Sequence, residues 1–219
     1  MPRPSRHLDR ALLAAGRALL PAHGCSGLTV RQVADAAGVN VSMFHYHFRT
    51  REAYLRAVMQ GAYEEMFSQL TLSISADARW SANLRSALRV VGRFVHENRA
   101  LMGRILADAL GGDEISREFL RENFPRHLRV IVGLVTAGQM AGELKKMDPA
   151  QAVAFCAGAI GSPLLMGGAL ADSGALDAAS RRRLQAAVLS KEAIDERVDL
   201  AIAALTVATP RSGRKGDIR

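Results

Sequence analysis

The side chains best suited to chemistry lie in one short run from Phe44 to Phe48, which reads Phe-His-Tyr-His-Phe. His45 and His47 are of the residue type that most often binds transition metals. On a helix, however, residues two apart point about 200° away from each other, so one ion cannot bind both. We therefore expect no metal site here, but ring donors and acceptors displayed on different faces of a helix.

Elsewhere the sequence shows no catalytic or cofactor motif. Gly161-Ser162-Pro163 falls short of the Gly-x-Ser-x-Gly nucleophile turn, and the phosphate-binding and zinc-protease patterns are missing. Cys25 and Cys156 form no Cys-x-x-Cys pair, which excludes a disulfide framework and a zinc ribbon. We expect two buried thiols in a reducing compartment, no cofactor and no enzymatic activity.

Helix signals surround the aromatic run and would position it. Thr29 and Gln32 have the spacing of a capping box, and Gly38 suits the left-handed turn that ends a helix. Asn40 and Thr50 are typical N-caps. The predicted helices are 30–37, 41–47 and a long one that runs to about Ser73. The first two would form a helix-turn-helix over about residues 29–48.

Helical spacing of apolar residues continues along the rest of the chain and predicts an all-α fold. Further helices are expected over Leu8–Leu19 (ended by Pro21 and Gly24), Leu84–Val95, Leu101–Leu106, Ile115–Val135, Pro149–Ala171, 178–190 and 191–208. The predicted domains are a three-helix N-terminal domain, residues 5–65, and a helical bundle, residues 66–208. A basic tail, residues 209–219, is expected to be disordered.

The charge of the chain is unevenly distributed. The net charge is +8, and residues 1–56 hold eight arginines against three acidic residues, a balance of +5. More than half of the excess therefore lies in a quarter of the chain, which favours a polyanionic partner for the N-terminal domain.

Two apolar stretches could be mistaken for membrane or targeting segments. The run that follows Arg10 is six residues long, too short for a signal peptide. Residues 149–171 carry no charge and are long enough to span a bilayer, but 11 of the 23 are Ala or Gly and Pro163 interrupts them. We expect a buried helix with a small-residue face, no membrane partner and a cytoplasmic location.

Residues 8–58 resemble the DNA-binding domain of TetR-family transcriptional regulators. The residues that carry the resemblance are Gly24, Thr29-Val30, Val33-Ala34, Ala37-Gly38-Val39, Phe44-His45-Tyr46-His47-Phe48 and Thr50-Arg51-Glu52. Histidine stands at 45 and 47, where the family often has tyrosine, and Arg51 replaces the usual lysine. The resemblance implies double-stranded DNA as a partner.

The resemblance also implies roles for individual residues. The implied phosphate contacts are Thr29, His45, Tyr46 and Arg51. The implied base or groove contacts are Arg31, Val41, Ser42, Met43 and His47. Two simpler alternatives stay open: Thr29 as a helix cap only, and Arg31 on a solvated face.

In the family, the remaining helices dimerise and often enclose a small-molecule pocket. For the dimer interface the sequence offers a small-residue face and an apolar stripe, with internal packing as the alternative: Ala150, Ala154, Ala157, Gly158 and Gly161, then Ile194, Val198, Ala201, Ile202 and Leu205. The candidate effector-pocket residues are Phe94, Met102, Leu106, Phe119, Leu120, Phe124, His127, Ile131, Met140 and Phe155. A histidine in that set is also compatible with a core position.

These observations predict a homodimeric regulator, a repressor that binds a palindromic operator and is released by a small, largely apolar effector. The alternatives are a ligand-independent dimeric DNA-binding protein, a helical enzyme, or a membrane-surface protein.

Overall fold

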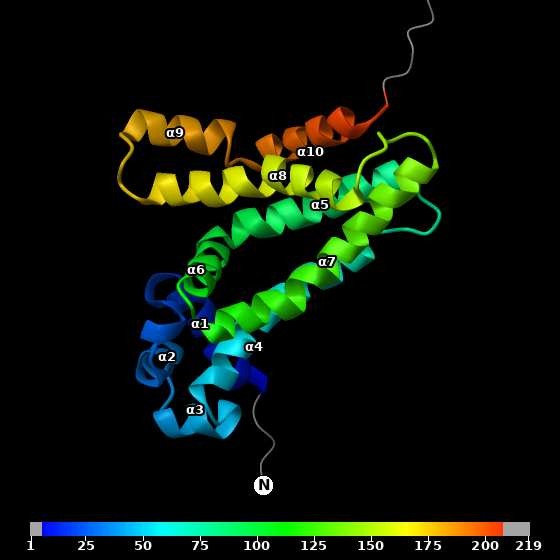
Figure 1. The fold of residues 1–219 in the computed structure, drawn as a ribbon. Helices are drawn as coiled ribbons and strands as arrows, with labels where there is room; N and C mark the ends of the chain where they lie inside the picture. The colour runs from blue at the N-terminus through cyan, green and yellow to red at the C-terminus, as the bar shows by residue number, and fades with distance from the viewer. Residues whose placement is uncertain (1–5, 208–219) are drawn as a thin grey trace, which may run out of the picture.

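The computed structural model describes residues 6–207 and is built from helices (Figure 1). The ten helices of this part are α1 (Arg6–Gly27), α2 (Val30–Ala37), α3 (Val41–Phe48), α4 (Arg51–Leu72), α5 (Trp80–Glu97), α6 (Arg99–Leu110), α7 (Glu114–Met140), α8 (Pro149–Asp172), α9 (Ala178–Ala187) and α10 (Lys191–Leu205). The predicted all-α class is confirmed; within residues 6–207 the only extended pairing is an isolated bridge between Leu144 and Thr206. The predicted basic tail lies outside the described residues.

The short helices near the N-terminus begin and end where the sequence predicts. The side chain of Thr29 accepts the N–H of Gln32, and the Thr29 N–H donates to the Gln32 side chain at 2.8 Å, which completes the capping box. Gly38 ends α2 with φ 68°, in the left-handed region. Asn40 and Thr50 cap α3 and α4 through their side chains. Local sequence therefore fixes the start of each helix in the motif.

Helix α1 continues past Pro21, which was predicted to help end it, but it is broken at Gly24, the other predicted end. Gly24 has φ 69° and ψ 175°, and helical hydrogen bonding resumes beyond it with Leu28 N–H donating to the Gly24 carbonyl at 3.2 Å. A side chain at Gly24 would collide with the guanidinium of Arg104. The first helix is therefore interrupted at Gly24, as predicted, and a short helical segment follows the kink.

A cluster of aromatic rings locks α3 onto α4. The ring centroid of Tyr54 lies 4.9 Å from that of Phe44 and 5.0 Å from that of Phe48. The Tyr54 hydroxyl donates to the Leu12 carbonyl of α1 at 2.6 Å, and burial raises the pKa of Tyr54. One side chain of α4 thus contacts both α3 and α1.

The C-terminal helices build a second core. Figure 1 shows α8 and α10 along one edge with α5 beside them, while α7 runs diagonally back to α4. Ile194 and Val198 of α10 are buried in this core. Arg89 of α5 lies 3.3 Å from a carboxylate oxygen of Asp195 and 3.6 Å from one of Asp199. Apolar packing and ion pairs together hold α10 on α5.

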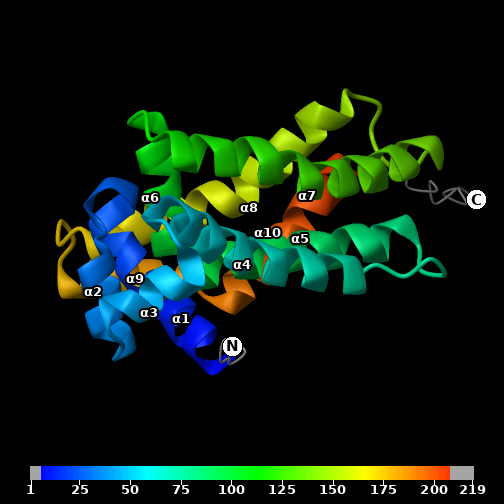
Figure 2. The same ribbon diagram turned by 90° about the horizontal axis from the view of Figure 1, so that it is seen from below.

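Three seams join the N-terminal helices to the bundle: α1 against α6, α4 against α7, and α4 against α5. Seen from below, α1, α2 and α3 gather at one end while α5 and α7 extend toward the other (Figure 2). At the first seam the Cys25 N–H donates to Asp108 of α6 at 2.7 Å. The Cys25 thiol also lies 3.3 Å from the hydroxyl of Ser116, at the start of α7. Both Cys25 and Cys156 are free and buried as predicted, and burial raises the pKa of each thiol to about 11.

Candidate nucleic-acid interface

The residues predicted to contact DNA from α3 lie mostly at the surface. Val41, Ser42, His45 and Tyr46 are exposed and Met43 is half-buried. Figure 1 shows α3 at the extreme end of the molecule, opposite α8 and α10, with no other helix in front of it. The outward face of α3 is thus open to a large partner such as duplex DNA.

The N-terminal end of α3 presents small hydrogen-bonding groups in a fixed arrangement. Asn40 accepts the Met43 N–H at 2.9 Å and the Ser42 hydroxyl at 2.6 Å through the same side-chain oxygen. The Ser42 oxygen keeps its lone pairs free to accept. Val41 beside it is 41% exposed, which offers an apolar contact of the kind that a thymine methyl group makes.

His45 is held by the turn that follows α3. Its Nδ1 lies 3.1 Å from the Arg49 carbonyl, so Nδ1 carries the hydrogen and Nε2 is the ring atom left to face a partner. Arg49 has φ 57°, a left-handed conformation that is uncommon outside glycine. The turn thus fixes which nitrogen of His45 is available.

Arg31 of α2 and its N-cap Thr29, both predicted to contact DNA, differ in whether their polar groups already have partners within the protein. Arg31 is extended into solvent with its side chain 87% exposed, and its nearest carboxylate, Asp35, is 3.9 Å away. The Thr29 hydroxyl donates to Gln32 at 2.8 Å as well as accepting the backbone N–H. Arg31 can therefore reach a phosphate, whereas the hydrogen of the Thr29 hydroxyl is already used in the cap.

The prediction that His47 contacts a groove is wrong for this structure. The side chain is 1% exposed, and its Nδ1 faces the carboxylate of Asp9 on α1. The spacing on α3 explains the error, because His47 lies three residues after the buried Phe44 and so shares its inward face. Sequence analysis missed Asp9, which carried no motif and lies 38 positions earlier.

Arg51 also has a different role from the predicted phosphate contact. Its Nε donates to the Leu28 carbonyl at 2.6 Å, and one terminal nitrogen donates to the Cys25 carbonyl. These acceptors lie at the C-terminal end of α1, where carbonyls lack helical partners. The guanidinium therefore caps α1 and faces the protein, which corrects the prediction.

The predicted effector-pocket residues do not converge. Leu106, Phe124, Met140 and Phe155 lie on the surface, and Met140 is 84% exposed. Phe119 and Ile131 are buried in two different cores, while Phe94, Met102 and Leu120 pack at the edge of the first of them. The grouping is therefore wrong as a single pocket, because helical periodicity does not show which of several faces an apolar residue occupies.

A cavity of about 420 Å³ opens instead between α4 and α7. Its lining residues are Arg56, Ala57, Gln60, Glu118, Phe119 and Glu122. Only Phe119 belongs to the predicted set, and most of the other lining side chains are charged or polar. The cavity thus differs in chemistry from the apolar pocket that the sequence suggested.

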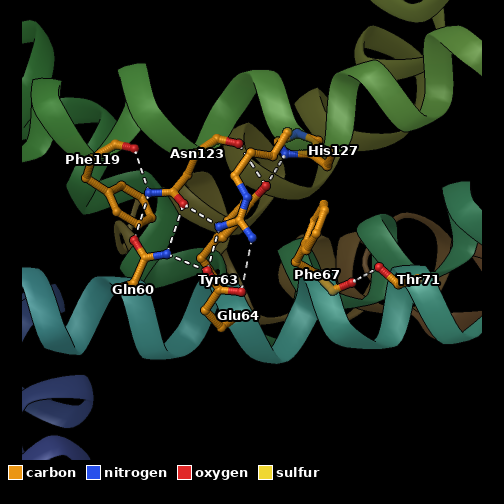
Figure 3. Close-up of polar contacts among 9 residues, drawn as sticks. Gln60, Tyr63, Glu64, Phe67, Thr71, Phe119, Asn123 and His127 are labelled. Atoms are coloured by element: carbon orange, nitrogen blue, oxygen red, sulfur yellow. Dashed lines mark hydrogen bonds and ion pairs between the residues drawn. The ribbon is translucent and has the colours of Figure 1, made fainter.

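Beside this cavity, a polar network crosses from α4 to α7 (Figure 3). The amides of Gln60 and Asn123 exchange two hydrogen bonds of 2.9 and 3.1 Å, although Asn123 is 2% exposed. Tyr63 donates to the Asn123 carbonyl at 2.8 Å and lies 3.3 Å from Nδ1 of His127. Burial lowers the pKa of His127 to about 4, so the ring is neutral near pH 7. His127 therefore belongs to the packing of this seam.

The two predicted halves of the dimer interface have opposite outcomes. Ala150, Ala154, Ala157 and Gly158 are exposed and Gly161 is half-buried, so the small-residue face of α8 is open. On α10 the predicted stripe is buried within the chain, which makes that half of the prediction wrong: Ile194, Val198, Ala201, Ile202 and Leu205. The stripe packs against α5 and α8, and the exposed apolar side of α10 carries Leu200, which is 68% exposed.

Two features bear on membrane and metal binding. Helix α8 is long and apolar enough to cross a membrane by length and composition. Within its most apolar stretch of 18 residues, 28% are buried inside the protein. It also packs against α5, α6, α7 and α10. Within residues 6–207, no group of three or more His, Cys, Asp or Glu side chains is placed to hold a metal ion.

The sequence and the fold were compared with those of known proteins. The family described as bacterial regulatory proteins, tetR family, matches residues 12–58, which run from α1 into α4. This stretch is about a fifth of the chain and includes the helix-turn-helix. The fold of the chain matches that of solved TetR-family structures, and a search of curated protein sequences finds no match.

Solved structures of transcriptional regulators share the fold over nearly the whole chain. A TetR-family regulatory protein from Rhodococcus RHA1 has a TM-score of 0.69 at 19% identity, covering 94% of this chain and 100% of its own. The ketosteroid transcriptional regulator of Mycobacterium tuberculosis has a TM-score of 0.67 at 13% identity, covering 91% and 95%. A protein from Saccharomonospora viridis, described as a transcriptional regulator and solved with choline, has 0.69 at 13%, covering 92% and 98%. The TetR architecture thus extends through the C-terminal bundle.

Proposed function

We propose that this chain is a TetR-family regulator that represses transcription as a homodimer and binds a palindromic DNA operator in the cytoplasm. The observation that carries the proposal is the open outward face of α3 at the end of the molecule, with Ser42 and Val41 exposed and Phe44 buried behind them. Small polar and apolar groups at the start of such a helix suit base edges in the major groove.

The second copy is proposed to pack on α8 and α10. The face carries Phe155, Met166 and Leu170 of α8 and Leu200 of α10, which are 47%, 73%, 43% and 68% exposed. A stretch of large exposed apolar side chains beside small residues favours burial against another protein. Because this face lies opposite α3, a two-fold axis through it would leave both recognition helices free, at a spacing of about 34–36 Å on DNA.

A small effector that releases the operator belongs to the same proposal. The neighbours solved with choline or described as a ketosteroid regulator make small organic molecules the class to test. An effector must bind one conformation better than the other to shift DNA affinity. The dispersal of the predicted pocket residues favours a second candidate, a dimer that binds DNA without an effector. A ligand screen monitored by operator release separates the two.

Selection of bound sequences from random DNA tests the DNA-binding proposal. The wild-type chain should enrich an inverted repeat with half-sites about one helical turn apart. Met43→Glu places a carboxylate on the open face of α3 and should abolish enrichment, because phosphates repel it. Met140→Glu is the matched control, since Met140 is exposed at the far end of α7, and it should enrich the same repeat. Absence of any enriched sequence with the folded wild type contradicts the proposal.

A further inference from the structure

The buried histidine of α3 has one polar partner. Nδ1 of His47 faces the carboxylate of Asp9, which lies in the first turn of α1, and no other ion pair or hydrogen bond of His47 is formed within residues 6–207. The other ring nitrogen, Nε2, is buried without a hydrogen-bond partner. The Asp9 side chain is 41% exposed, so the contact spans from the protein surface into the interior.

Helix α3 depends on such contacts for its orientation. It has eight residues, far fewer than an isolated helix needs to be stable in water. Phe44 and Phe48 both pack on the Tyr54 ring of α4, so these ring contacts attach α3 to one neighbouring helix. His47 lies on the same face as Phe44, one turn later. Its link to Asp9 attaches α3 to a second helix, α1.

We propose that His47 is a positioning residue for DNA recognition and that, through Asp9, it sets the orientation in which α3 presents Ser42 and Val41. This inference rests on the proposed DNA-binding function. The ring itself is inaccessible to a base or a phosphate, because the side chain is 1% exposed. Its effect on DNA is therefore indirect, through the attachment of α3 to α1.

The two possible roles of His47 predict opposite effects of one substitution. Asp9→Ala removes a negative charge from a DNA-binding domain. If His47 acts on DNA by itself, loss of that charge should leave operator affinity unchanged or raise it. If His47 acts through Asp9, the same substitution should lower affinity about tenfold, as expected for a lost hydrogen bond to a charged group.

The test is a double-mutant cycle in the full-length chain with the selected operator. Asp9→Ala and His47→Leu should each weaken binding about tenfold, and the double variant should be no weaker than either. His47→Asn should stay within about threefold of wild type, because its amide N–H can occupy the place of Nδ1. The slope of affinity against salt should not change, since no phosphate contact is lost. Multiplicative losses, tighter binding by Asp9→Ala, or failure of His47→Asn to retain affinity would each overturn the proposal.

Amide hydrogen exchange in the DNA-free protein separates this proposal from the DNA-binding function itself. Asp9→Ala and His47→Leu should both speed exchange in residues 44–48, while α7 exchanges as in wild type. His45→Leu is the matched control, because His45 is exposed and its ring bonds only its own turn; exchange at Phe44 should stay slow. If the chain bound no DNA, this result would still support the link. Unchanged exchange of α3 in both test variants would refute it.

Discussion

The sequence predicted that both α3 and α10 contact a partner, but most of the predicted residues are exposed on α3 and all of them are buried on α10. On α3 the predicted surface residues Ser42 and Tyr46 are exposed. On α10 the predicted stripe, for example Ile194 and Val198, is fully buried against α5 and α8. Helical periodicity thus identifies the apolar face of a helix but does not show whether the same chain or a partner covers that face. On α3, the polar residues that lie outside the apolar repeat, such as Ser42, identified the exposed face correctly.

The predicted interface had a second half, the small-residue face of α8, which is open in the structure. Blocking this face should have the largest effect. A side chain at Gly158 would meet no atom within 4 Å in the single chain. Gly158→Trp should therefore fold but fail to dimerise, and operator affinity should fall at least about 100-fold because each half-site would be bound independently. Light scattering and operator titration measure both effects.

Gly133→Trp is the matched control for that experiment. Gly133 is an exposed position on α7 that also has no atom within 4 Å of an added side chain. It should remain dimeric and keep its operator affinity. A folded Gly158→Trp variant that stays dimeric would show that the partner binds elsewhere.

The buried side of α10 is tested on the monomeric Gly158→Trp background. Ile194→Ala should lower the free energy of unfolding by about 2–4 kcal/mol, because it opens a cavity in the core. Leu200→Ala, on the exposed side of the same helix, should change it by less than about 0.5 kcal/mol. Urea denaturation measures both. Equal effects would mean that α10 does not present distinct buried and exposed faces.

Protonation of His127 should weaken the seam between the two regions. Its folded pKa is about 4, below the ordinary 6.5, so between these values the unfolded chain binds a proton that the folded chain does not. Stability from this group is complete above pH 6.5 and is lost as the pH falls to about 4, by roughly 2–3 kcal/mol. Urea denaturation from pH 7.5 to 4 measures the loss. His127→Leu should remove this part of the slope, and a full slope in that variant would assign it to other groups.

Because Arg51 caps α1, its substitution should lower the stability of the protein and leave the number of phosphate contacts unchanged. Arg51→Leu leaves the Leu28 and Cys25 carbonyls without their donor, which should cost about 1–3 kcal/mol of stability. The salt dependence of operator binding should keep its slope, because no phosphate contact is lost. A slope lower by about one unit would restore the phosphate role. Thermal unfolding and salt titration of the same variant decide between them.

Local signals made the N-terminal domain predictable. The capping box at Thr29, the left-handed turn at Gly38 and the caps at Asn40 and Thr50 act within one helical turn, so the sequence alone places the helix boundaries. Gly24 shows the limit of such signals. The sequence marks it as a break in the helix, but not that Arg104, 80 positions away, leaves no room for a side chain there.

The errors in the candidate site have the same physical origin. Asp9 and His47 are joined by folding and share no sequence motif. Arg51 looks like a phosphate ligand until the carbonyls at the end of α1 are in place. Pairing between distant positions decides which polar group is free for DNA, and nothing in the local sequence encodes that pairing.

If the exposed start of α3 contacts bases, Ser42→Ala must change which base pairs the protein prefers. Wild type and variant would be titrated against the selected operator and all single-base variants of one half-site. The variant should lose discrimination at one or two base pairs, by about 1–3 kcal/mol, with the other positions unchanged. A uniform loss at every position, or no change at any, would contradict the claim that this face of α3 contacts the bases.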